Sequence, residues 1–222
     1  MTTPNTSARR QPIGLDDESM GDWFTVHKRQ LTWAALALGI LFGGLWFWRR
    51  SQSVKAARAE GAYFQARRSA AEGNLPLAVT ELQKVANRYE GTRSGTQARL
   101  FVAQLLYQQK KYKEGVAELK KAESKVGAED LLPSIFVLEA TGYEELKDFS
   151  AAAEQYKKAS AATRFVAEKE QFLAAAARAY AAGGKTAEAI AIWTSLAEND
   201  AGVLAAEARV RLGELKARPM KI

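Results

Sequence analysis

Four stretches of this sequence repeat the same residue types at a constant spacing of 37 residues. One column of the repeat contains only small residues: Ala78, Gly115, Ala152 and Ala189. A second column, twelve residues earlier, contains only alanine: Ala66, Ala103, Ala140 and Ala177. A period of roughly 20–50 residues is typical of stacked repeats, in which each unit buries its apolar face against its neighbours. We therefore expect pairs of helices that cross at points where only small side chains fit.

The spacing of turn-forming residues divides the repeat region into helices. Alanine is abundant, proline is scarce and no β-type alternation occurs, which predicts an all-α chain. The sequence predicts helices over 54–72, 76–89, 94–109, 113–125, 130–146, 150–162, 165–182, 186–198 and 202–217. The expected fold is a right-handed α-solenoid of about four helix pairs. The last helix is expected to cap it, with Leu204, Val210 and Leu212 facing the stack.

An uncharged apolar segment, residues 31–48, precedes the repeats. At about 1.5 Å per residue it is roughly 27 Å long, close to the thickness of a bilayer core. Charged residues flank it on both sides, and we expect a single uncleaved transmembrane anchor rather than a core helix or a signal peptide. The anchor residues expected to face lipid are Trp33, Leu36, Ile40, Phe42, Trp46 and Trp48.

The anchor implies three regions. Residues 1–30 are expected to be a disordered tail that ends in an amphipathic lead-in around Trp23 and Phe24, 31–48 the anchor, and 49–222 the solenoid with its capping helix. Residues 49–68 carry most of the excess positive charge of a chain whose formal net charge is +7. A basic collar beside a membrane is typical of contact with lipid phosphates. No aromatic-interleaved basic face extends it, so nucleic acid is not an expected partner.

The residues needed for most catalytic chemistry are missing from the repeats. The chain has no cysteine, and its single histidine, His27, precedes the anchor. Gly183-Gly184-Lys185-Thr186 resembles the end of a phosphate-binding loop, but Ala179 stands where such a loop needs glycine. We interpret it as a turn between helices. We therefore expect no enzyme activity, no catalytic or metal-binding residues, no cofactor and no small-molecule substrate.

The repeat columns resemble the tetratricopeptide repeat. The segments 102–122 (VAQLLYQQKKYKEGVAELKKA) and 139–159 (EATGYEELKDFSAAAEQYKKA) carry the resemblance best, although the period here is 37 residues rather than the usual 34. The resemblance implies a generic protein-binding scaffold. In this family the first helices of successive units line a concave groove. When the groove positions of the family are transferred to this sequence, the expected groove wall consists of Tyr63, Arg67, Leu100, Gln104, Tyr107, Gln108, Val137, Thr141, Glu144, Glu145 and Arg178.

The order of the segments is similar to a narrower family, the bacterial ancillary SecYEG translocon subunit (YfgM-like) family. An acidic tail, an aromatic and basic lead-in, a glycine-containing anchor and about four repeats follow one another in the same order. This resemblance implies an inner-membrane protein with a cytoplasmic N-terminus and periplasmic repeats. Its implied partners are translocon subunits, a membrane-bound prolyl isomerase or chaperone, and secreted clients. Arg49 and Arg50 oppose this orientation, but long domains cross membranes largely regardless of charge.

Two functional classes stay open from the sequence. The first is a membrane-anchored interaction module for secretion and chaperoning. The second is a structural or assembly scaffold, for example in cell division or in another membrane complex. Both require the same fold, so only the proteins that copurify with the chain distinguish them.

Overall fold

The computed structural model describes the backbone of residues 17–217 and the side chains of His27, Arg29, Gln30 and 32–217. The expected disordered tail lies largely outside the described residues, as do the side chains of Trp23 and Phe24. The chain divides into two compact units, Met1–Gln52 and Ser53–Ile222. The described part is all helical: α1 (Asp17–Ala71), α2 (Leu75–Arg88), α3 (Arg93–Gln108), α4 (Tyr112–Ser124), η1 (Glu129–Leu131), α5 (Leu132–Glu145), α6 (Phe149–Ala162), α7 (Val166–Ala182), α8 (Thr186–Glu198) and α9 (Ala205–Ala217).

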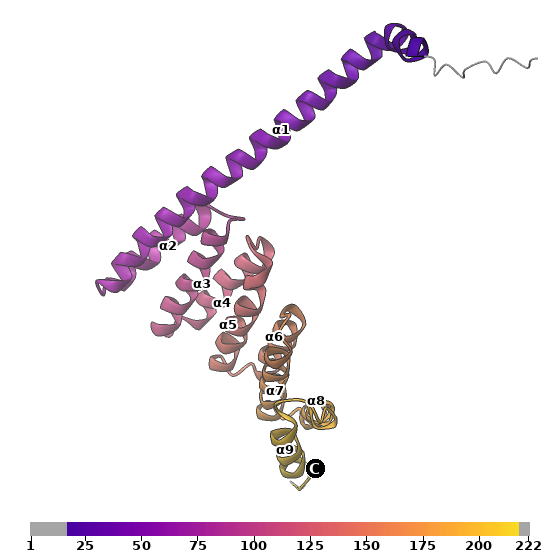
Figure 1. The fold of residues 1–222 in the computed structure, drawn as a ribbon. Helices are drawn as coiled ribbons and strands as arrows, with labels where there is room; N and C mark the ends of the chain where they lie inside the picture. The colour runs from indigo at the N-terminus through magenta and orange to yellow at the C-terminus, as the bar shows by residue number, and fades with distance from the viewer. Residues whose placement is uncertain (1–16, 218–222) are drawn as a thin grey trace, which may run out of the picture. The chain divides into compact units, whose positions relative to one another are not determined.

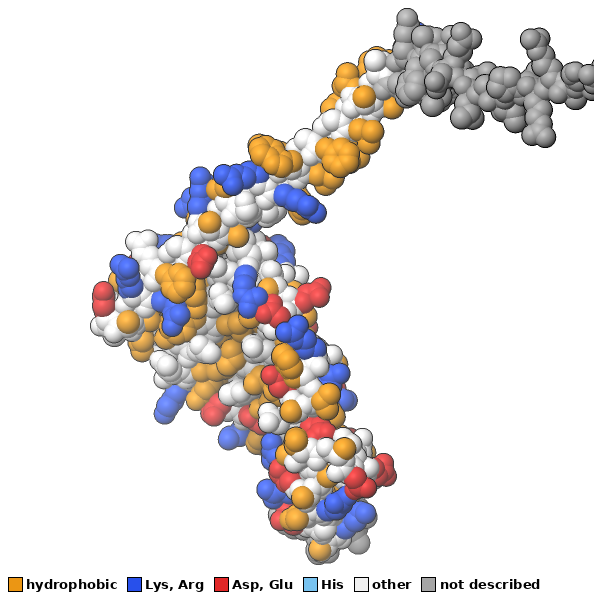
Figure 2. All heavy atoms as spheres, in the orientation of Figure 1, with side chains coloured by type: hydrophobic (Ala, Val, Ile, Leu, Met, Phe, Trp, Pro, Cys, Tyr) orange, Lys and Arg blue, Asp and Glu red, His pale blue; other side chains and the backbone are white. Residues whose placement is uncertain are grey.

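In the first unit, α1 carries the apolar segment. One helix of the described chain is long and apolar enough to cross a membrane, in the region that begins at Thr32, and its apolar stretch is not buried. The six expected lipid-facing residues are all exposed, from 55% for Leu36 to 69% for Ile40 and Trp46. Apolar side chains form a band along the visible face of this part of α1 (Figure 2). This arrangement is compatible with a membrane span.

In the second unit, helix pairs stack from the C-terminal part of α1 to α9 (Figure 1). Both small-residue columns lie in the core: each of their alanines is at most 3% exposed, and Gly115 is also buried. Leu82, Leu119 and Trp193, each four residues after a member of the first column, are at most 1% exposed. The expected helix crossings are therefore confirmed. From α2 to α8 the helices begin and end within about two residues of the expected positions, whereas the first expected helix, 54–72, is the C-terminal part of the continuous α1.

The turns inside the helix pairs repeat with the same period. Gly73, Lys110, Lys147 and Gly184 have positive φ, between 60° and 81°, and follow one another at intervals of 37 residues. In each turn the next residue donates its N–H to the carbonyl five residues back, as Lys111 does to Leu106 at 2.8 Å. This pattern is a Schellman-type helix end. The interpretation of Gly183-Gly184-Lys185-Thr186 as a turn is confirmed, because Gly184 occupies this position between α7 and α8.

The last helix differs in detail from the expectation. It begins at Ala205 rather than 202, because residues 199–204 form a turn that the buried Glu170 of α7 organises. The Glu170 carboxylate accepts from Asn199 Nδ2 at 2.8 Å and from the Leu204 N–H at 3.3 Å. Ala208 is fully buried, and Leu204, Leu212 and Leu215 pack against the core. The expectation that Val210 faces the stack is wrong, since Val210 is 61% exposed.

Candidate functional site

The first helices of the pairs are the C-terminal part of α1, then α3, α5 and α7. A hollow between α7, α8 and α9 is lined by Arg178, Ala181 and Trp193, among others. Two further hollows lie along the first helices. The larger, which we call the main groove, has a volume of about 640 Å³, and the smaller, between α1 and the start of α3, about 330 Å³. The main groove is lined by α3, η1, α5, the α6–α7 connection and α7. Its lining residues are Gln104, Glu129, Asp130, Pro133, Ser134, Val137, Leu138, Ala162, Thr163, Arg164, Phe165, Glu168 and Phe172.

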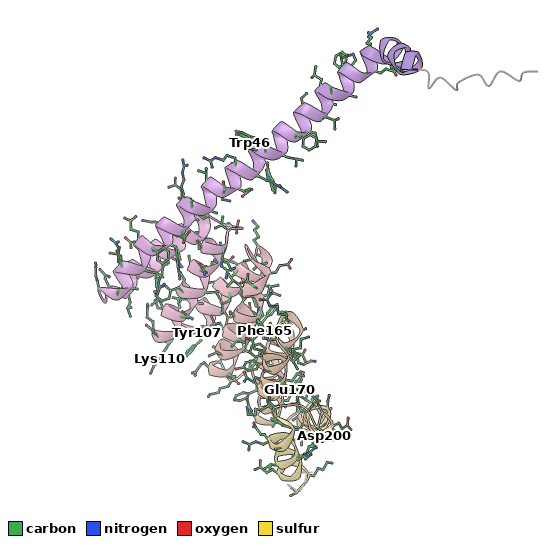
Figure 3. The ribbon with its side chains drawn as sticks, viewed as in Figure 1. Trp46, Tyr107, Lys110, Phe165, Glu170 and Asp200 are labelled. Carbon is green, nitrogen blue, oxygen red and sulfur yellow. The ribbon has the colours of Figure 1, made fainter. Side chains whose placement is uncertain are left out.

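A short connection between α6 and α7 positions the aromatic edge of the main groove. Thr163 and Phe165 both have extended backbone, with ψ of 145° and 121°, so the chain leaves one helix and enters the next almost directly. The Thr163 hydroxyl accepts from the Phe165 N–H at 3.2 Å and donates to the carboxylate of Glu168. These bonds fix the backbone of Phe165 at the start of α7 (Figure 3), and 53% of the residue is exposed.

One exposed ion pair joins the two hollows. Arg93, which lines the smaller hollow, donates to the Asp130 carboxylate of the main groove at 2.8 Å. The hydrogen bond from Arg93 is the main reason why the pKa of Asp130 is lowered, and Arg164 lowers it further. Asp130 therefore stays ionised and already has a cationic partner.

The structure brings some of the expected wall residues to the hollows. Gln104 and Val137 line the main groove, and Tyr63 lines the smaller hollow. The Arg67 guanidinium lies over the rings of Tyr63 and Phe101, at 5.6 and 5.5 Å. Gln108 and Glu145 are exposed but line neither hollow.

Other expected wall residues are engaged inside the stack. Leu100 is buried in a core cluster, and the Tyr107 hydroxyl donates to the Leu138 carbonyl at 2.9 Å. Thr141 donates to the Val137 carbonyl of its own helix, and Glu144 accepts from the Tyr156 hydroxyl of α6. Arg178, by contrast, is exposed: it pairs with Glu207 of the capping helix at 3.1 Å and lines the hollow between α7, α8 and α9.

Phe165, Arg164, Glu129 and Glu168 also line the main groove but are not among the expected wall residues. The expected positions all lie inside the first helices, whereas these four residues lie in or next to the connections between units. A usable signal was present, because the connection reads Thr163-Arg164-Phe165-Val166, and large apolar residues are unusual in an exposed turn. In the described residues, no group of three or more His, Cys, Asp or Glu side chains is placed to hold a metal ion.

Comparison with known proteins identifies the repeat. A family model, the tetratricopeptide repeat-like domain, matches residues 22–137. A crystal structure of a thermophilic TPR protein from Thermus thermophilus is similar at 20% sequence identity and a TM-score of 0.45, over 85% of this chain and 97% of that chain. No curated protein matches the chain. The family match covers more than half of the 222 residues. The chain therefore belongs to the tetratricopeptide repeat-like domain family.

Proposed function

We propose that this protein is a membrane-anchored interaction module of the bacterial envelope, which works beside the protein translocon and periplasmic chaperones. Tetratricopeptide-type repeats generally mediate protein–protein interaction. The observation that carries the proposal is the main groove on the first helices, where the exposed Phe165 lies beside hydrogen-bonding and charged side chains. An apolar anchor residue surrounded by polar groups is the usual composition of a peptide-binding surface.

The apolar band of α1 supports the anchor. Tryptophan, phenylalanine and isoleucine side chains between residues 33 and 48 are 60–69% exposed, which is costly in water and favourable in lipid. The family match begins at residue 22, before this band, so the apolar segment is part of the matched domain rather than an addition to it. In the proposed arrangement residues 31–48 span the inner membrane, the N-terminus is cytoplasmic and the repeats are periplasmic.

The size of the groove favours weak binding of short segments. A volume of about 640 Å³ holds only a short segment, so a single client is expected to bind with a dissociation constant on the order of micromolar. Anchoring beside the site where secreted chains emerge would compensate through a high local concentration. The expected partners are translocon subunits, a membrane-bound prolyl isomerase or chaperone, and the secreted clients themselves.

Site-directed photocrosslinking in cells tests this function. A photoreactive residue at Gln104 or Ser134, both exposed in the main groove, is expected to capture secreted clients and translocon-associated proteins. The matched controls are Ala117 and Lys120, which are exposed on α4, a second helix that does not line the groove. Equal yields from both faces would contradict a binding role for the groove. Capture of cell-division or other complex subunits alone would favour the assembly scaffold instead.

A further inference from the structure

The charged side chains that line the main groove are mostly acidic. They are the carboxylates of Glu129, Asp130 and Glu168 and the guanidinium of Arg164. This excess of negative charge occurs in a chain whose formal net charge is +7. The groove is therefore opposite in sign to the protein as a whole.

Two of these carboxylates are available to a ligand. Asp130 is already paired with Arg93 at 2.8 Å, and the Arg164 guanidinium lies 4.9 Å from the centre of the Phe165 ring. Glu168 accepts from the neutral Thr163 hydroxyl. Within the described residues, neither Glu168 nor the exposed Glu129 forms an ion pair.

The remaining groove surface is largely apolar. Val137, Leu138 and Phe172 are half-buried along α5 and α7, and the exposed Phe165 stands at the edge. An aromatic ring offers a large rigid contact area at little conformational cost. An apolar side chain on this surface would lie beside the two acidic groups, within one groove of about 640 Å³.

We propose that the main groove selects segments in which lysine or arginine stands next to an apolar side chain. The apolar side chain would pack against Phe165 and Phe172, and the cation would pair with Glu129 or Glu168. Charge complementarity then favours basic segments over acidic ones of equal apolarity. This inference rests on the proposed function, because it names the class of client that the same groove accepts.

The test compares two fluorescent peptides that share an apolar core and differ only in having lysine or glutamate flanks. Binding to the full-length chain in a neutral detergent is measured by anisotropy. We expect the basic peptide to bind at least about tenfold more tightly at low salt, with the difference shrinking as salt screens the charges. Long-range attraction to a chain of net charge +7 would favour the acidic peptide, so a basic preference reports the groove itself.

Variants locate the preference. The double substitution Glu129→Gln/Glu168→Gln is expected to abolish the difference between the peptides, whereas Glu188→Gln, at an exposed position on α8 outside the groove, leaves it unchanged. Phe165→Ala is expected to weaken the binding of both peptides.

The outcomes separate this inference from the proposed function. Equal affinities, tighter binding of the acidic peptide, or a basic preference that survives the double substitution would overturn the charge selection. In those cases, weaker peptide binding by the Phe165→Ala variant would still support the main groove as the binding site. If neither peptide binds, the charge selection is overturned. If, in addition, crosslinking is equal from both faces of the repeats, the proposed function is overturned as well.

Discussion

Replacement of Arg99 by alanine is expected to lower the free energy of unfolding by about 3 kcal/mol, because it breaks a buried ion pair and leaves the nearly buried Glu118 with the exposed Lys121 as its remaining cation. Arg99 lies on α3 with its side chain only 6% exposed. It donates to Glu118 of α4 at 2.9 Å and to Asn87 of α2 at 3.1 Å, so it links three successive helices. Chemical unfolding of the full chain in mild detergent, followed by circular dichroism, measures the effect.

Two variants control for the Arg99 prediction. Arg93→Ala removes an exposed pair with Asp130, whose side chains are 54% and 59% exposed, and is expected to cost at most about 1 kcal/mol. Arg99→Met combined with Glu118→Met is expected to recover most of the lost stability, because it removes both buried charges together. If the Arg99→Ala variant unfolds at the same denaturant concentration as the Arg93→Ala variant, the buried network does not hold these helices together.

Raising the pH from 5 to 8 is expected to weaken the stack through Glu139. This α5 residue is fully buried, and neither carboxylate oxygen has a hydrogen-bond partner among the described residues. Burial, reinforced by the nearby Glu123, raises the pKa of Glu139 from 4.5 to about 7, although Lys158 and Lys120 oppose the shift. The folded state therefore favours the protonated acid, whose contribution is fully present below about pH 4.5 and is lost as the pH rises through 7.

The size of this effect follows from the shift. At about 1.4 kcal/mol per pKa unit, the loss on ionisation is up to about 3 kcal/mol. Other carboxyls, such as Glu90 and Glu154, have lowered pKa values, so the stability that they contribute is lost as the pH falls rather than as it rises. The difference between the wild-type chain and Glu139→Gln is therefore the informative quantity. Thermal unfolding of the two proteins should diverge between pH 5 and 8, and parallel profiles would show that Glu139 does not titrate in this range.

The sequence predicts the stack because packing constraints repeat along it. Ala103, Ala140 and Ala177 are small for a local reason, the close crossing of two helices, and their burial is complete. The same periodicity places Gly73 and Gly184 in the left-handed turn conformation. Lys110 and Lys147 adopt this conformation without any residue signal, because the surrounding helices fix the turn.

The groove was harder to predict because its shape depends on connections rather than on helix positions. Carrying over the first-helix positions gave Gln104 and Val137 but also Leu100 and Tyr107, which pack inside the stack. The orientation of a helix in the stack decides which face stays open, and η1 and the α6–α7 connection supply the residues that complete the groove. Neither the orientation of the helices nor the residues of these connections follow the repeat period in the sequence.

In the proposed topology, residues 31–48 anchor the chain in the inner membrane and the repeats lie on the periplasmic side. Protease added to intact spheroplasts tests it most directly when the full-length chain carries one epitope tag before residue 30 and another after the repeats. We expect rapid loss of the tag on the repeats and protection of the N-terminal tag, with both tags lost once the membrane is permeabilised. Loss of the N-terminal tag with protection of the repeats would show the reverse orientation and contradict the proposed topology.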